Sequence, residues 1–125
     1  MKKQLSISSL VFALAVFSPM VFAHAEHGQA QYGGVVAEAG MAQFELVSNG
    51  GQLIVYLSNH GQAVASAGAT GKLTILEGAK KSELDLKPAG DNRLEAKGSA
   101  ASGAKVLISV QLPNSSPMQA RAVMK

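Results

Sequence analysis

The chain has 125 residues and a formal net charge of +3, from 11 lysines and arginines against 8 aspartates and glutamates. Two of the lysines are at positions 2 and 3, so the remainder is close to neutral, which excludes the basic balance of a nucleic-acid-binding protein. The chain has no cysteine, which excludes disulfides, thiolate metal sites and cysteine nucleophiles. A hydrophobic core must therefore hold the fold.

Residues 1–23 are typical of a secretory signal peptide, with two lysines, an apolar run and small residues near Ala23. We favour cleavage after Ala23, close to the end of the apolar run, and cleavage after Ala25 is the alternative. The apolar run is shorter than the ~20 residues that a membrane-spanning helix needs. We therefore expect a periplasmic protein that is not inserted in a membrane after cleavage.

Residues 24–33 show no apolar period, and we expect a flexible tail there. The tail carries His24 and His27, two of the three histidines of the chain. If cleavage follows Ala23, His24 offers its α-amino nitrogen and its imidazole to one metal ion, and His27 can add a third nitrogen. Such nitrogen ligands favour Cu(II), with Zn(II) and Ni(II) as alternatives.

Residues 34–125 consist of short β-type runs separated by turn residues. Residues 43–47 alternate, with Phe44 and Leu46 on one face and Gln43 and Glu45 on the other. Residues 53–57 are apolar on both faces, which predicts a central strand. Further runs are expected at 35–38, 63–65, 72–76, 82–87, 92–96, 106–112 and 118–124.

The spacing of these turns is typical of β-sandwiches and β-barrels. We predict an all-β domain, an antiparallel β-sandwich of immunoglobulin-like type with eight or nine short strands. A small β-barrel is the alternative.

His60 lies in a predicted hairpin turn, Asn59-His60-Gly61, where its side chain can meet the tail. Met41, in an earlier loop, can offer a soft thioether to Cu(I). The candidate metal ligands are therefore His24, His27 and His60.

Motifs for catalysis are weak. The segment around Gly71-Lys72 fails as a phosphate loop, because Ser66 and Leu73 stand where glycine and serine or threonine are needed. Glu83 and Asp85 share the solvated face of an alternating strand, and no serine stands in a nucleophile-elbow pattern. We predict that the protein is not an enzyme and has no organic cofactor.

Several segments resemble small periplasmic proteins found with heavy-metal and copper efflux systems. They run Gly33-Gly34-Val35-Val36 with Glu38-Ala39-Gly40, 43–47, Leu53-x-Val55-Tyr56-Leu57-x-Asn59-His60-Gly61, 68–74 and 92–96. They are also similar to the His-Gly-Gly segment and β-domain of adaptor subunits in metal-exporting pumps. Tyr32 stands where such proteins often have the histidine, and His27-Gly28 lies slightly upstream.

This resemblance implies a periplasmic metal-binding accessory in metal resistance or efflux, with an efflux adaptor or other envelope protein as partner. The alternative is an interaction module that needs no metal and docks on such a protein through an exposed strand edge.

Overall fold

The computed structural model describes residues 28–125, which fold into β-strands joined by turns and loops. The strands are β1 (Val35–Ala39), β2 (Ala42–Asn49), β3 (Gln52–Asn59), β4 (Gln62–Ala63), β5 (Thr70–Glu77), β6 (Lys80–Pro88), β7 (Arg93–Lys97), β8 (Lys105–Gln111) and β9 (Met118–Val123). Across this part of the chain, no helix has the length and apolar character required to cross a membrane.

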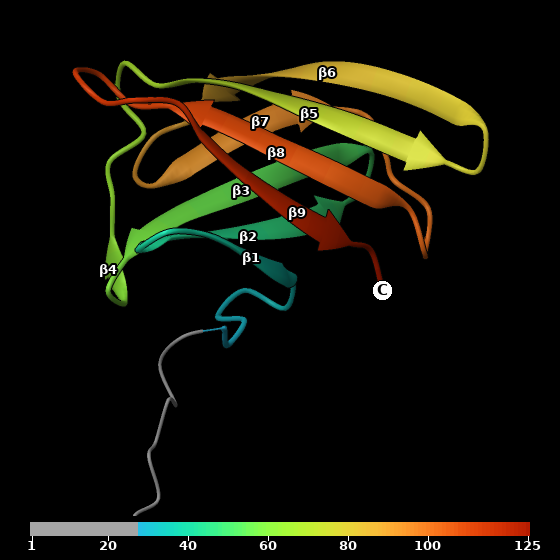
Figure 1. The fold of residues 1–125 in the computed structure, drawn as a ribbon, viewed down its shortest axis with the longest axis horizontal. Helices are drawn as coiled ribbons and strands as arrows, with labels where there is room; N and C mark the ends of the chain where they lie inside the picture. Colours follow the sequence, from blue (N-terminus) through green and yellow to red (C-terminus); the bar gives the residue numbers. More distant parts are fainter. Residues whose placement is uncertain (1–27) are drawn as a thin grey trace, which may run out of the picture.

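The strands form one antiparallel sheet in the order β1-β2-β3-β7-β6-β5-β8-β9, with β4 paired to β3. The sheet curls until its two end strands, β1 and β9, lie side by side (Figure 1). The result is a nearly closed barrel in which β3 has a partner on each edge, as its two apolar faces predicted.

Strand β6 joins the two halves of the sheet. It pairs with β5 from Lys80 to Leu86, and its last two residues then pair with β7, Lys87 opposite Glu95 and Pro88 opposite Leu94. Proline has no backbone N–H to donate, so this ladder ends at Pro88. One strand therefore belongs to both halves, whereas a sandwich would leave its two sheets unpaired.

The all-β prediction is confirmed, and each expected run contains residues of a strand. Of the two architectures considered, the structure matches the small barrel better than the immunoglobulin-like sandwich. The physical reason is the pairing of β6 with β7, which makes the sheet continuous.

Tight hairpins fix the register of most neighbouring strands. The β2–β3 loop is Gly50–Gly51 and the β3–β4 loop is His60–Gly61, and all four residues have positive φ. Two-residue loops with two positive φ angles match the right-handed twist of the strands that they join. A shift of one residue would move every inward side chain to the outer face, so these turns determine which residues form the core.

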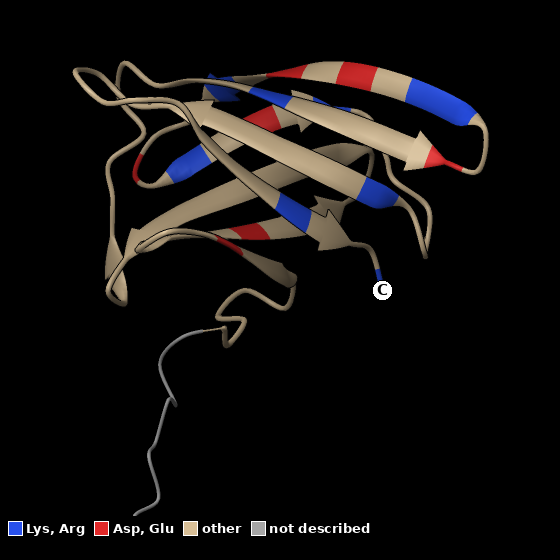
Figure 2. Cartoon of the chain, viewed as in Figure 1, with Lys and Arg blue, Asp and Glu red and all other residues tan. Residues whose placement is uncertain are grey.

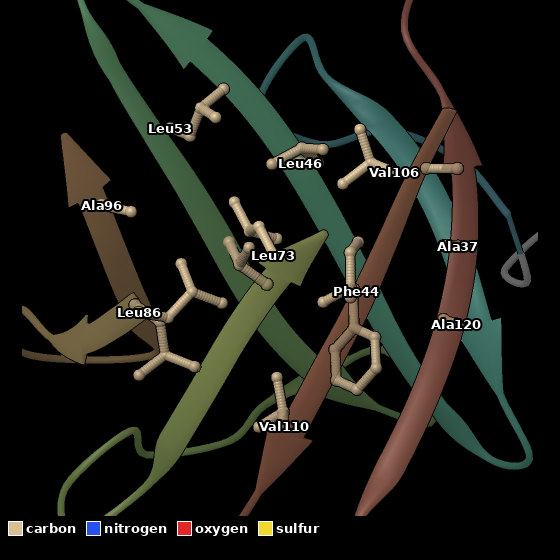
Figure 3. Packing of buried hydrophobic residues seen from close by; sticks show 14 of the residues in the cluster. Ala37, Phe44, Leu46, Leu53, Leu73, Leu86, Ala96, Val106, Val110 and Ala120 are labelled. Atoms are coloured by element: carbon tan, nitrogen blue, oxygen red, sulfur yellow. The ribbon is translucent and has the colours of Figure 1, made fainter. Parts of the chain in front are cut away.

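The core fills the barrel with aliphatic side chains and one phenylalanine (Figure 3). The largest side chains with almost no exposure are Phe44, Leu46, Leu53, Leu57, Leu73, Ile75, Leu94 and Ile108. Small residues, Ala37 on β1 and Ala120 and Ala122 on β9, face inward where the end strands approach each other. Their size lets the sheet close to a small radius.

Substitutions at an inward and an outward position of β5 test which side chains of this strand form the core. Leu73 is fully buried, whereas Leu76 on the same strand is 42% exposed. We expect Leu73→Ala to lower the free energy of unfolding by about 2–5 kcal/mol, because it leaves a cavity in the core. Leu76→Ala is the matched control and should cost about 1 kcal/mol or less. Urea denaturation measures both, and equal losses would contradict the assigned faces.

Candidate functional site

His60 occupies an exposed turn at one end of the barrel. Its φ of 50° and the φ of 77° at Gly61 make a two-residue loop between β3 and β4. Histidine is among the non-glycine residues enriched at positive φ, together with asparagine and aspartate. His60 directly follows the last residue of β3 and is exposed at the protein surface.

Met41 lies at the same end of the sheet. Ala42 of β2 is paired with Asn59 of β3 at this end of the ladder. Met41 comes just before Ala42 and His60 just after Asn59, so each lies in the turn next to this pair. Met41 is 61% exposed, which is unusual for an apolar side chain of its size. The thioether of Met41 and the imidazole of His60, two ligand types that bind copper, therefore belong to residues adjacent to the same antiparallel pair.

The first described residues run along the outer face of β2. Gly28 lies nearest the Met41 end of the strand, and the residues after it extend away from that end. The backbone N–H of Gly28 donates to Gln43 Oε1 at 3.2 Å. Gln43 is two residues from Met41 along β2, and its cross-strand partner Ser58 is two residues from His60 along β3. The hydrogen bond therefore holds Gly28 beside the two turns.

Glu45 holds the following residues of the same segment. Its side chain is only 3% exposed, and its carboxylate accepts three backbone N–H groups. Oε1 accepts from Gln31 at 2.6 Å, and Oε2 accepts from Tyr32 at 2.7 Å and from Gly34 at 2.9 Å. Hydrogen bonds to a charged acceptor are about twice as strong as neutral ones, so this clamp orders residues 31–34.

Two further contacts complete the clamp. The Tyr32 ring stacks on Tyr56, which is opposite Glu45 in the β2–β3 ladder, with ring centroids 3.7 Å apart and planes at 6°. Gly34 lies so close to β2 that a Cβ atom there would collide with the Leu46 carbonyl oxygen and with Val47 Cγ2. Only glycine fits this position without displacing the strand.

A small pocket of about 20 Å³ lies under the clamp, and Tyr32, Glu45, Tyr56, Ser58 and Asn92 are among its lining residues. Its volume suits about one water molecule and not an organic ligand.

Charge is distributed unevenly between the two halves of the barrel (Figure 2). Within residues 28–125, every lysine and arginine lies at or after Lys72, so strands β1 to β4 carry only the carboxylates of Glu38 and Glu45. Cationic side chains are confined to β5–β9 and their flanking residues. Arg93 of β7, opposite Tyr56 of β3, forms an ion pair with Glu95 at 3.7 Å, so β1–β4 themselves present only carboxylates to a cation.

The predicted ligands are distributed as follows. His60 is in the described turn, and His24 and His27 lie outside the described residues. Among residues 28–125, no group of three or more histidine, aspartate or glutamate side chains is arranged to hold a metal ion.

Sequence reasoning missed the role of Glu45. The alternating pattern put it on the outer face of β2, which it does occupy, but an outer face implied solvent. The segment that covers it was expected to be flexible up to residue 33, whereas residues 28–34 make four hydrogen bonds to Gln43 and Glu45. The only local signal was Gly33-Gly34, a pair that permits close approach of two backbones.

Comparison of the chain with models of protein families, with curated proteins and with solved structures finds no match.

The clamp predicts a specific effect of Glu45→Gln. The amide keeps the shape but removes the charge and one acceptor, so a backbone N–H loses its partner. We expect a loss of about 1.5–3 kcal/mol in unfolding free energy. We also expect faster amide exchange at Gln31, Tyr32 and Gly34.

Tyr32 and Tyr56 are the only tyrosines in the chain, and there is no tryptophan, so near-ultraviolet circular dichroism reports directly on their stacking. Glu45→Gln should reduce this signal. Glu38→Gln, an exposed carboxylate on the neighbouring strand, is the control and should change neither signal nor stability. An unaltered tyrosine signal in Glu45→Gln would show that the carboxylate does not order the segment.

Proposed function

We propose that this chain is a periplasmic metal-binding accessory protein that supports metal resistance or efflux, with copper as its preferred ion and Zn(II) or Ni(II) as alternatives. His24, His27 and His60 supply nitrogen ligands, and Met41 adds a thioether when the ion is Cu(I). A cleaved signal peptide delivers the protein to the periplasm.

The observation that carries the proposal is the hydrogen bond between Gly28 and Gln43, which holds the start of the described chain beside the Met41 and His60 turns. His27 is the residue bonded to Gly28. His24 is four residues from Gly28, and four extended residues span at most about 14 Å. Two residues of strand span about 7 Å, the separation between Gln43 and Met41 along β2. His24 is therefore within chain length of the Met41 turn, which lies at the same end of the sheet as His60.

The charges on β1–β4 also favour a metal ion at the end of the barrel that bears Met41 and His60. Strands β1–β4 carry Glu38 and Glu45 and no cationic side chain, so a metal ion bound beside them meets no repulsive neighbour on these strands. The clamp on residues 31–34 adds pre-organisation, because these residues are already ordered and lose less entropy when a ligand binds nearby.

The second candidate is an interaction module that needs no metal. Leu76 and Val123 are exposed on the outer faces of β5 and β9, 42% and 54% respectively, which favours a surface that docks on another protein. The metal titration below separates the two candidates.

Metal binding is tested by calorimetric titration of the mature protein with Cu(II) and Zn(II), its N-terminal residue established by mass spectrometry. We expect about one Cu(II) per chain with a dissociation constant below about 1 µM, and loss of binding near pH 5 as imidazoles are protonated. Quenching of tyrosine fluorescence by Cu(II) gives an independent signal. No binding at near-millimolar metal would refute the proposal.

Variants assign the ligands. The double variant His24→Ala, His27→Ala should abolish tight binding. His60→Asn should weaken it by about tenfold, the loss of one ligand, while asparagine preserves the positive φ of the turn. Gln52→Ala, in an exposed position at the opposite end of β3, is the control and should leave the affinity unchanged. Equal affinity in the double variant and the parent would remove the tail from the site.

A further inference from the structure

A groove crosses the outer face of β5, β8 and β9, on the opposite half of the sheet from the metal-binding end. Its volume is about 540 Å³. Its lining includes three aliphatic side chains, Leu76, Leu107 and Val123, and three cationic ones, Lys81, Lys105 and Arg121.

The register places these side chains in two adjacent rows across the sheet. Leu76 is opposite Lys105, and Lys105 is opposite Val123. In the next row, Leu107 is opposite Arg121. Side chains directly opposite each other on one face are about 5 Å apart, so each cation of β8 and β9 stands next to an aliphatic side chain.

The groove carries unbalanced positive charge. Neither Lys105 nor Arg121 forms an ion pair with a carboxylate of residues 28–125, and no carboxylate lines the groove. Glu83, which is opposite Thr74 in the β5–β6 ladder, lies 3.7 Å from Lys72 and 3.8 Å from Lys81. Figure 2 shows a blue, cationic segment on each of the strands β8 and β9.

We propose that this groove binds an acidic segment of another polypeptide, one whose carboxylates alternate with aliphatic side chains. The carboxylates pair with Lys105 and Arg121, and the aliphatic side chains lie against Leu76, Leu107 and Val123. This proposal does not depend on metal binding, because none of its residues is a candidate ligand.

The shape of the surface favours a polypeptide over an anionic membrane. A bilayer is flat on this scale and would touch only the rim of a hollow, whereas a chain with protruding side chains can fill it. Strand addition at β1 or β9 is disfavoured, because these two end strands lie against each other. A second copy of this face is disfavoured by repulsion between its cations.

The test uses a short, terminally blocked peptide in which glutamates alternate with leucine and valine, added to the mature protein in EDTA. Amide shifts are followed by NMR. We expect a dissociation constant of about 10–500 µM, typical of a small surface, with shifts confined to β5, β8 and β9. Affinity should fall as sodium chloride rises, because exposed charges are screened. The same peptide with glutamines should bind at least about tenfold more weakly.

Variants locate the site. Lys105→Glu with Arg121→Glu should weaken peptide binding at least about tenfold. Lys87→Glu with Lys97→Glu makes the same change in net charge outside the groove and should preserve the affinity within about twofold. Val123→Thr, which keeps the shape of an exposed side chain, should weaken binding without loss of fold.

Three results would overturn the proposal. The first is equal affinity for the glutamate and glutamine peptides. The second is equal loss in the two charge-reversed pairs, which would indicate a general charge effect. The third is binding to phosphatidylglycerol vesicles without binding to the peptide, which would assign the groove to a lipid surface.

Discussion

The pairing of β6 with both β5 and β7 is the constraint on which the barrel depends. Without the Lys87–Glu95 and Pro88–Leu94 pairs, β1–β4 with β7 and β5, β6, β8 and β9 would be two separate sheets. With them, one curled sheet encloses a single core that includes Phe44 from one half and Leu73 from the other. A chain with no cysteine has no covalent crosslink between halves, so this core and its backbone ladder carry the stability.

The outer faces of the two halves of the barrel differ in what lies against them. On β2 and β3 the outer face is covered by residues 28–34, and three backbone N–H groups of this segment satisfy the Glu45 carboxylate that it removes from water. On β5, β8 and β9 the aliphatic side chains of Leu76 and Val123 are exposed on the outer face, and within residues 28–125 Lys105 and Arg121 beside them form no ion pair.

The sequence was informative wherever a local pattern decides the structure. Alternation identified the faces of β2, the two apolar faces of residues 53–57 predicted a central strand, and Asn59-His60-Gly61 predicted a hairpin turn. Two features were beyond its reach. The pairing of β6 with β7 depends on the closure of the whole sheet, and the burial of Glu45 depends on a segment 11–14 residues earlier in the chain. The alternation of apolar and polar residues along a strand predicts which face a residue occupies, but it does not predict what covers that face.

The two proposed sites can be occupied at the same time, because they share no residue and lie on different halves of the barrel. The proposed metal site includes the turns of Met41 and His60 beside β1–β4, strands whose only acidic or basic side chains are Glu38 and Glu45, and the groove belongs to β5, β8 and β9, where cations predominate. Strands β1–β4 therefore favour a cation and the groove favours an anion, and neither ligand must displace the other. A protein arranged in this way can hold a metal ion at one end while its opposite face is bound to an acidic partner, which is the geometry that an accessory to a larger assembly requires.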